Sequence, residues 1–366
     1  MTDPVTDIRP APPKRRWGLF LPAAALLLLV AVYTVYWFTI AGELREGVEA
    51  FAARRDNGLV VSWDDLAITG YPYRIEADFT APGASAPDAP EEWAWHGEGA
   101  AFALLPYNLR HVIVNLEGEQ TFSYRDVTAS APARNEARAT AAKAWGSYVD
   151  VADAPFGRIA IDIEELDARH RRGATGLNDR LTAERLQFHT RAAIDEANGL
   201  INGSYDVAIQ ADGVVLESEE KILALGPNIK QIVAQARLRD LPQTPHVSAI
   251  ELLREWQRTG GVLSISELIV KWGPLDLAAH GEFKLDARRR LEGQFDAKIT
   301  GFETLLDAMV RDGLVKEREA NVALAGLVLV SQFQGKKTNE VRIPVMMREG
   351  LLYLGPLAVA RLEPLY

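Results

Sequence analysis

The segment from Trp17 to Gly42 contains no charged side chain, and no other feature constrains the chain as strongly. A helix of about 20 apolar residues is long enough to cross the hydrocarbon core of a bilayer, and this segment is longer. Basic residues 14–16 precede it, and acidic residues follow it from Glu43 onward. By the positive-inside rule, the sequence predicts a disordered cytoplasmic tail over residues 1–16 and a single transmembrane helix over residues 17–42.

The lipid bilayer is therefore the first expected partner. Tyr33, Tyr36 and Trp37 lie near the C-terminal end of the apolar segment, and such residues favour the boundary between hydrocarbon and water. A helical pattern then continues to about residue 55. A cleaved secretory signal is the alternative, but its apolar core is usually only about 7–15 residues long. Because Thr39-Ile40-Ala41 is only a weak cleavage site, we favour a retained anchor.

The composition limits the functions that residues 43–366 can have. These residues are expected to lie on the far side of the membrane from the N-terminus. The net charge of −10 argues against nucleic-acid binding, because phosphate recognition needs a basic face. The absence of cysteine excludes disulfides, thiolate metal sites and a cysteine nucleophile. A cysteine-free exported chain fits the bacterial envelope, so we expect an inner-membrane protein with its bulk in the periplasm.

Alternation of apolar and polar residues predicts a β-rich domain. Ile75, Ala77 and Phe79 alternate with charged or polar residues, as in a strand with one apolar face. Similar alternation recurs around residues 112–116, 159–163, 205–209, 263–277, 295–299 and 352–359. Helical periodicity instead predicts helices over residues 219–239, 247–258, 302–314 and 317–334.

The predicted fold class is therefore α+β. An N-terminal transmembrane helix is followed by curved antiparallel sheet, with several packed helices, because consecutive strands joined by short turns form meanders. Residues 43–366 are long enough for a large core, and their length is compatible with two modules. In that division, modules 43–218 and 259–366 are joined by a helical segment, 219–258.

A strand–turn–strand motif that combines glycine and proline recurs along the chain. Glycine permits a backbone angle that other residues resist, and proline fixes the angle that follows, so the pair reverses or kinks a strand. We interpret these residues as hairpin corners rather than ligand-binding positions. The predicted structural turn residues are Gly70, Pro72, Gly273, Pro274, Gly355 and Pro356.

The same motifs carry a resemblance to a known family. The anchor, Gly70-Tyr71-Pro72-Tyr73-Arg74, Trp272-Gly273-Pro274-Leu275 and Leu354-Gly355-Pro356-Leu357 resemble the domain of unknown function 2125 family of alphaproteobacterial envelope proteins. That resemblance implies an envelope location but, since the family has no assigned activity, no functional residues. The strand–glycine–strand texture of residues 262–300 is also similar to AsmA-like inner-membrane proteins. Those extend β-sheet grooves into the periplasm, which implies a role in lipid transport.

No pattern of catalytic or metal-binding residues stands out. The six histidines show no zinc spacing, and no nucleophile elbow, Walker loop or dinucleotide fingerprint occurs. Ser218-Glu219-Glu220-Lys221 has the serine–lysine spacing of penicillin-recognising enzymes, but their other two motifs are missing. We expect no cofactor, no metal and no enzymatic activity. The alternative is an enzyme without a recognised signature, with His111, His280, Asp64 and Ser218 as its candidate residues.

An acidic cluster follows the apolar strand at residues 159–163. Asp162, Glu164, Glu165 and Asp167 alternate with the isoleucines of that strand or come directly after them. Neighbouring acids on one strand point outward together. We therefore predict a solvated face or a charged sheet edge that discourages aggregation, rather than a hydrolase carboxylate pair or a calcium site.

Aromatic residues gather around the predicted strands. An ordinary sheet core is the simplest explanation, because large aromatic side chains bury readily. The sharper hypothesis is that a curved sheet presents one apolar face to a groove that holds acyl chains or a partner. The candidate apolar-surface aromatics are Tyr71, Tyr73, Trp93, Trp95 and Trp272.

The leading functional hypothesis is a non-enzymatic envelope protein whose periplasmic domain binds or conveys a hydrophobic ligand. The expected ligand is a lipid. The main alternative is a structural or assembly factor that docks envelope proteins through its strand edges. The third hypothesis is the enzyme without a recognised signature.

Overall fold

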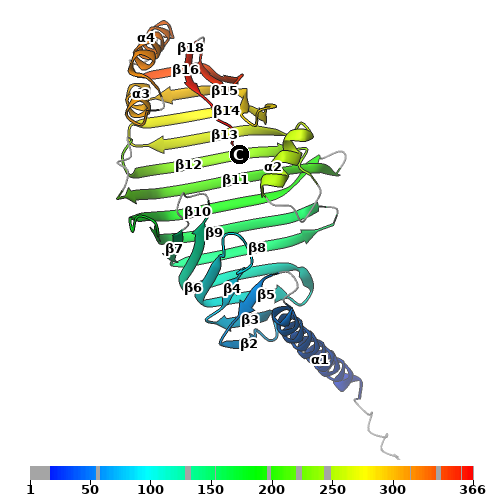
Figure 1. Ribbon diagram of the computed structural model, residues 1–366. Helices are drawn as coiled ribbons and strands as arrows, with labels where there is room; N and C mark the ends of the chain where they lie inside the picture. Colours follow the sequence, from blue (N-terminus) through cyan, green and yellow to red (C-terminus); the bar gives the residue numbers. More distant parts are fainter. Residues whose placement is uncertain are drawn as a thin grey trace, which may run out of the picture.

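A long helix and one large antiparallel sheet dominate the protein (Figure 1). The computed structural model describes residues 17–54, 58–127, 133–152, 154–195, 199–219, 225–242, 249–313, 315–334, 339–355 and 357–365. The helices are α1 (Trp17–Ala53), α2 (Ala249–Arg258), α3 (Phe302–Arg311) and α4 (Glu317–Phe333). The predicted tail, residues 1–16, lies outside the described residues.

Strands make up most of the described chain. The first nine are β1 (Val60–Ser62), β2 (Asp65–Thr69), β3 (Ile75–Thr80), β4 (Gly83–Ser85), β5 (Ala94–Leu105), β6 (Asn108–Asp126), β7 (Ala133–Thr140), β8 (Lys143–Val151) and β9 (Ala154–Arg171). The others are β10 (Asn178–Asp195), β11 (Gly199–Ser218), β12 (Asn228–Arg239), β13 (Val262–Trp272), β14 (Leu275–Leu285), β15 (Leu291–Thr300), β16 (Glu340–Arg348), β17 (Leu351–Leu354) and β18 (Leu357–Arg361).

Helix α1 confirms the predicted N-terminal apolar helix. It is long and apolar enough to cross a membrane: its most apolar window has a mean hydropathy of 2.1, and only 6% of that window is buried. It continues without a break to Ala53, close to the predicted end of the helical pattern.

Every strand pairing in the described chain is antiparallel, as predicted. From β8 to β18 each strand pairs with the next one along the chain. Nearer the N-terminus the order branches: β3 pairs with β2 and β5, and β4 pairs with β1 and β5. Strands β7 and β8 lie end to end and together fill the place of one strand between β6 and β9.

The helices do not form a layer over this sheet, so the predicted arrangement with several packed helices is not supported. Helices α2, α3 and α4 confirm three of the expected helical segments, but the expected helix over residues 219–239 is wrong. Residues 228–239 form β12, which lies inside the sheet between β11 and β13. The described residues of segment 219–258 therefore form a strand followed by a helix, and the division into two modules stays a prediction.

A bulge in β12 explains the misleading periodicity. Ile229 pairs with Trp272 and Gln231 pairs with Lys271, so Lys230 is an extra residue in the ladder. An extra residue shifts the alternation by one position, which puts Ile229 and Ile232 on the same face although they are three residues apart. A spacing of three residues is also what a helix produces.

The bulge belongs to a line of irregular positions that crosses the sheet. Glu165 in β9 and Glu184 in β10 face each other but are left out of the pairing between these strands, and Gly213 in β11 is left out of the pairing opposite Lys230. Gly213 has a φ of 59°, a left-handed value that glycine adopts without steric cost. Because these positions are aligned, each strand keeps its apolar residues on one face on both sides of the line.

Helices α1, α3 and α4 pack on the two ends of the sheet, whereas α2 lies against the strand ends in its middle, where Trp256 donates to the carbonyl oxygen of Arg239 at 2.8 Å (Figure 1). At the N-terminal end, Trp37 and Ala41 of α1 pack against Ile75. At the C-terminal end, α3 and α4 pack on β14–β16 around Phe302 and Val341, which are 1% and 0% exposed. Both sets of contacts involve the same face of the sheet, the one that carries Ile68 and Ile343.

Candidate functional site: the apolar face of the sheet

Cross-strand register aligns apolar residues into an unbroken row. One residue from each strand between β2 and β16, apart from β4 and β7, pairs directly with the next member of the row. All members are apolar or glycine. This first apolar row is Ile68, Ala77, Phe102, Val114, Gly146, Ile161, Phe188, Ile209, Ala234, Leu268, Ala279, Ala297 and Ile343.

A second apolar row lies beside the first, two residues away along each strand and hence on the same face. It has no polar member either. It comprises Leu66, Phe79, Ala100, Leu116, Ala144, Ile163, Leu186, Ala211, Ile232, Val270, Leu277, Ile299 and Val341. Since neighbouring strands lie about 4.8 Å apart, each row is about 58 Å long, roughly twice the thickness of a bilayer's hydrocarbon core.

This apolar face is covered at its ends and open in its middle. Ala77 near α1 is 1% exposed, and Ile343 beneath α3 and α4 is 6% exposed. Between them, Phe102, Ile161 and Ile209 are 36%, 38% and 42% exposed. These three residues belong to the same row as the buried ones, so the difference comes from cover by the helices and not from residue type.

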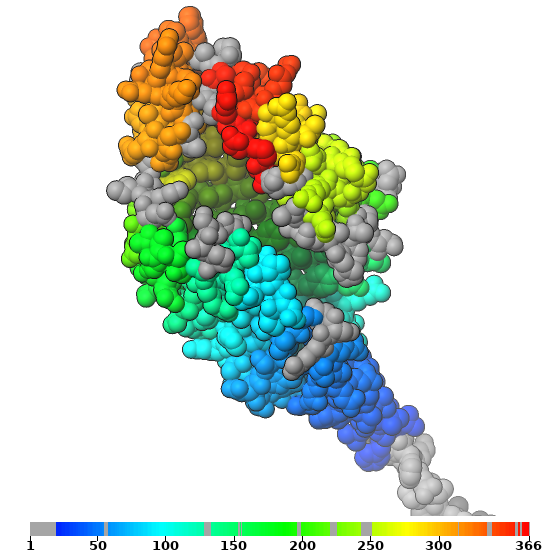
Figure 2. Space-filling model, in the orientation of Figure 1, coloured from blue at the N-terminus to red at the C-terminus, as the bar shows by residue number. Residues whose placement is uncertain are grey.

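Figure 2 shows the face on which these residues lie. It is hollowed between the β2–β6 end and the end formed by α3, α4 and β16–β18. Helices α3 and α4, which pack on the apolar face, border the hollow. Helix α4 contacts both β16 and β18, so this end of the sheet curls around the helix toward the apolar side.

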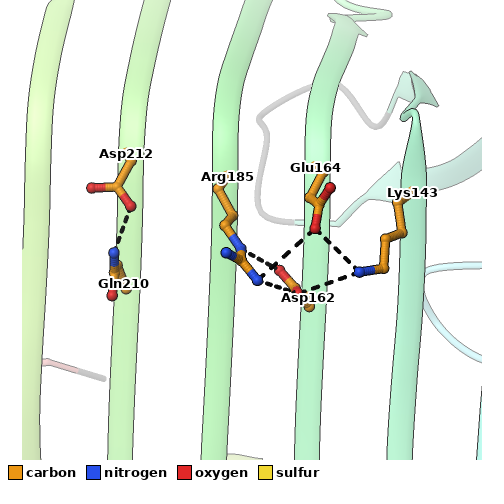
Figure 3. Close-up of polar contacts among 6 residues, drawn as sticks. All are labelled: Lys143, Asp162, Glu164, Arg185, Gln210 and Asp212. Carbon is orange, nitrogen blue, oxygen red and sulfur yellow. Dashed lines mark hydrogen bonds and ion pairs between the residues drawn. The ribbon is translucent and has the colours of Figure 1, made fainter.

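The opposite face carries ion pairs that cross the strands (Figure 3). Arg185 in β10 binds Asp162 in β9 through two hydrogen bonds, Nε to Oδ1 at 2.9 Å and Nη2 to Oδ2 at 2.7 Å. Lys143 in β8 lies 3.1 Å from Glu164 and 3.8 Å from Asp162. In β11, Asp212 accepts a hydrogen bond from Gln210 at 2.6 Å. We call this group the polar ladder: Lys143, Asp162, Glu164, Arg185, Gln210 and Asp212.

Similar pairs continue along the same face. Arg180 in β10 makes two hydrogen bonds to Asp167 in β9, at 3.1 and 2.8 Å, and Arg237 in β12 donates to Asp206 in β11 at 2.6 Å. Arg237 lies directly opposite Asp206, whereas Arg180 lies diagonally from Asp167. Opposite charges on neighbouring strands stabilise one register over its neighbours. A shallow depression on this face is lined by Asp206 and Arg237 among others, and both are already paired.

The polar ladder suits a structural role better than an acid–base role. The hydrogen bonds from Arg185 lower the pKa of Asp162, against the opposing effect of burial, and raise the pKa of the guanidinium. A general acid at neutral pH needs a carboxyl pKa that is raised instead. The geometry therefore holds Asp162 as a carboxylate at neutral pH.

The prediction that this acidic cluster is a solvated face or a charged edge is wrong for Asp162. Its side chain is only 3% exposed, and β9 is paired on both sides. The physical reason is that β8 and β10 supply Lys143 and Arg185, whose side chains cover the carboxylate. The sequence of β9 alone does not indicate these partners.

The predicted turn residues lie between consecutive paired strands. Gly70 and Pro72 lie between β2 and β3, Gly273 and Pro274 lie between β13 and β14, and Gly355 lies in the turn after β17. A Cβ on Gly273, which has a φ of 53°, would lie 2.4 Å from the carbonyl oxygen of Leu225. This turn accordingly requires glycine. Pro356 lies outside the described residues.

The candidate aromatics do not gather into one surface. Tyr71 packs against Trp37 and Phe38 of α1 at ring-centroid distances of 5.5 and 5.9 Å, while Tyr73 is 83% exposed. Trp93 stacks on Phe122, and the Trp95 indole donates to Gln120 at 3.2 Å. Trp272 donates to the carbonyl oxygen of Gly226 at 2.7 Å. The residues that form the open apolar face are mainly aliphatic. The sequence alternation predicts them as strand residues, but they were not among the candidate surface residues.

The residues of the enzyme alternative are dispersed. His111 in β6 lies 2.8 Å from the Ser147 hydroxyl, and His280 in β14 lies 3.9 Å from Asp296. Ser218 is at the end of β11, where its hydrogen bond is the largest cause of a lowered pKa at Asp179. Within the described residues no group of three or more histidine, aspartate or glutamate side chains has the geometry of a metal site.

Comparison with known proteins identifies the family but no characterised relative. No curated protein matches the chain, and no solved structure matches it. The resemblance to AsmA-like proteins therefore stays a prediction. One family model matches residues 37–363, which is nearly all of the chain from the end of the apolar segment onward. The chain belongs to this family, which is described as "Uncharacterized protein conserved in bacteria (DUF2125)".

Proposed function

We propose that this protein is a membrane-anchored envelope protein that binds or conveys a lipid along the apolar face of its sheet. The observation that carries the proposal is the first apolar row, which has no polar member and is open in its middle. Monomeric soluble proteins rarely expose long contiguous apolar surface, so such a face needs an occupant.

A lipid is the occupant that the surroundings of the face favour. The first apolar row starts at Ile68, which packs in one cluster with Trp37, Ile40 and Ala41 of α1. The apolar face is thus continuous with the helix that is apolar enough to enter a bilayer. An acyl chain that leaves the bilayer beside α1 would meet hydrocarbon side chains and no charged group along either row.

The contrast between the two faces supports the same proposal. The polar ladder and its neighbouring ion pairs occupy one face, while hydrocarbon side chains occupy the other. A sheet with both faces exposed to water would have no reason to keep two complete rows of one face free of charged side chains. The periplasm is the compartment we propose for the sheet, on the basis of the basic residues before α1.

The proposal is tested with matched substitutions on the two faces. The full-length protein is extracted in mild detergent, and co-purified phospholipid is quantified by mass spectrometry. Ile161→Asp with Ile209→Asp places charge on the apolar face. The control, Ala160→Asp with Ala208→Asp, places the same charge one residue away on the opposite face.

The parent protein and the control are expected to retain phospholipid, whereas the apolar-face variant is expected to lose most of it. Equal amounts of lipid in all three proteins would show that the lipid surrounds α1 only. Absence of lipid from the parent, together with failure to move lipid between vesicles, would reject the proposal and favour the assembly-factor alternative.

A further inference from the structure

Two hairpin turns of the sheet lie alongside the membrane-spanning part of α1. The Thr34 and Tyr71 hydroxyls are 2.7 Å apart, which joins α1 to the turn between β2 and β3. The Tyr33 hydroxyl donates to the carbonyl oxygen of Pro72 in the same turn. The Tyr36 hydroxyl donates to the carbonyl oxygen of Pro106, in the turn between β5 and β6, at 2.9 Å.

Strand β2 brings the first of these turns back toward the membrane. Arg45 of α1 donates to the carbonyl oxygen of Leu66 at the start of β2, whereas Thr34 meets Tyr71 just after its end. The strand therefore runs antiparallel to α1. About eleven residues of helix and about five of strand both cover roughly 16 Å, so the two elements stay side by side over this distance.

These contacts show where the bilayer boundary falls on α1. Trp37 and Ala41 are only 3% and 7% exposed because they pack on Ile75, so this part of α1 is occupied by the sheet. The residues from Trp17 to Tyr36 remain for the bilayer. At 1.5 Å per residue they span about 30 Å, the thickness of the hydrocarbon core. The boundary therefore lies near Tyr36, level with both turns.

The tips of both turns expose residues that favour a membrane interface. Tyr73 and Tyr107 are each 83% exposed, and Leu109 is 47% exposed. Arg74 and Arg110 follow directly in the sequence, with side chains 58% and 65% exposed. Each lies beside one acid, Glu76 and Asp150 respectively, and still reaches solvent. Tyrosine prefers the headgroup region, where its ring meets acyl chains and its hydroxyl stays hydrated, and arginine reaches the phosphates from the same depth.

We propose that these two turns form a second membrane contact beside α1, which we call the tyrosine tips: Tyr73 and Tyr107 with the residues around them. The occupant is the headgroup region of the bilayer that α1 crosses. Contact at three points fixes the orientation of the sheet and holds the α1 end of the apolar face at the bilayer surface. This contact goes beyond the proposed function and does not depend on ligand binding by the apolar face.

Single-cysteine labelling tests the proposal without background, because the chain has no cysteine of its own. Tyr73→Cys and Tyr107→Cys are each labelled with an environment-sensitive fluorophore. The full-length protein is then reconstituted in vesicles of phosphatidylethanolamine and phosphatidylglycerol. Glu349→Cys, in the exposed turn between β16 and β17, is the matched control at the far end of the sheet.

Labels at positions 73 and 107 are expected to show blue-shifted emission that is quenched by lipids with a spin label near the headgroup. The label at 349 is expected to show neither effect. If the labels at 73 and 107 are as insensitive to spin-labelled lipid as the label at 349, the proposal is wrong. A blue shift without quenching would overturn it as well, since the fluorophore would then be buried against protein.

Discussion

The open middle of the apolar face predicts a difference in stability between two isoleucines of the same row. Ile343 lies beneath α3 and α4 and is 6% exposed, whereas Ile209 lies in the middle and is 42% exposed. The same substitution, isoleucine to alanine, is made at each position. The two variants then differ only in how well the side chain is covered.

The expected costs follow from the buried fractions. The substitution removes about three carbon groups, each worth about 0.8 kcal/mol when fully buried. At Ile209, with just over half of the side chain buried, this gives about 1.4 kcal/mol and no cavity. At Ile343 the transfer cost is about 2.3 kcal/mol, and the cavity that remains raises it to about 3–4 kcal/mol. The expected difference is thus about 2 kcal/mol.

Chemical unfolding of the full-length protein in one fixed detergent measures this difference, with tryptophan fluorescence as the signal. The ordinary-core explanation makes the opposite prediction, because a second layer would cover Ile209 as well as Ile343. Equal losses of unfolding free energy at the two positions would therefore refute the description of the face as open.

Three further predictions concern the ladder, the turns and the anchor. The pKa of Asp162 is lowered in the folded state, so its contribution to stability is present above the ordinary carboxyl pKa and is lost as the pH falls through the lower folded value. Unfolding midpoints of the parent and Asp162→Asn, measured from about pH 5 to pH 2, should converge, and a constant gap would contradict this linkage. Gly355→Ala should cost about 1 kcal/mol for its left-handed backbone alone, and Gly273→Ala should cost clearly more because its Cβ meets the Leu225 carbonyl. Equal unfolding midpoints for Gly355→Ala and Gly273→Ala would contradict this prediction. Trp37→Ala removes a 3%-exposed side chain between α1 and the sheet, so proteolysis at Arg54, directly after α1, should become faster; an unchanged rate would mean that the sheet does not depend on this contact.

The sequence pattern was enough to predict those parts of the fold in which the spacing of apolar residues matches the side chains that are buried. The uncharged segment from Trp17 to Gly42 favours an apolar helix, and the structure contains helix α1 there. The alternation in Ile75, Ala77 and Phe79 favours a strand, and the structure contains strand β3 there. The alternation also predicts an apolar face. It does not predict that the faces of so many strands align in register, because alignment is set by pairing between strands.

The two wrong predictions, the helix over residues 219–239 and the solvated Asp162, have the same physical cause. Ile229 and Ile232 look helical because of an extra residue, Lys230, whose effect is visible only against β11 and β13. Asp162 looks solvated because its partner, Arg185, comes from another strand. Both depend on contacts between segments far apart in the chain, and a single sequence carries no direct record of these contacts.

The most direct test of the account asks what touches the middle of the apolar face in the cell envelope. A photoactivatable amino acid is placed at Ile209 in one full-length protein and at the adjacent Ala208, on the opposite face, in another. After irradiation, adducts are identified by mass spectrometry. If lipid occupies the apolar face, adducts with the mass of phospholipid are expected at position 209 and none at position 208. Protein adducts alone at position 209, or equal lipid adducts at both positions, would contradict lipid binding by this face.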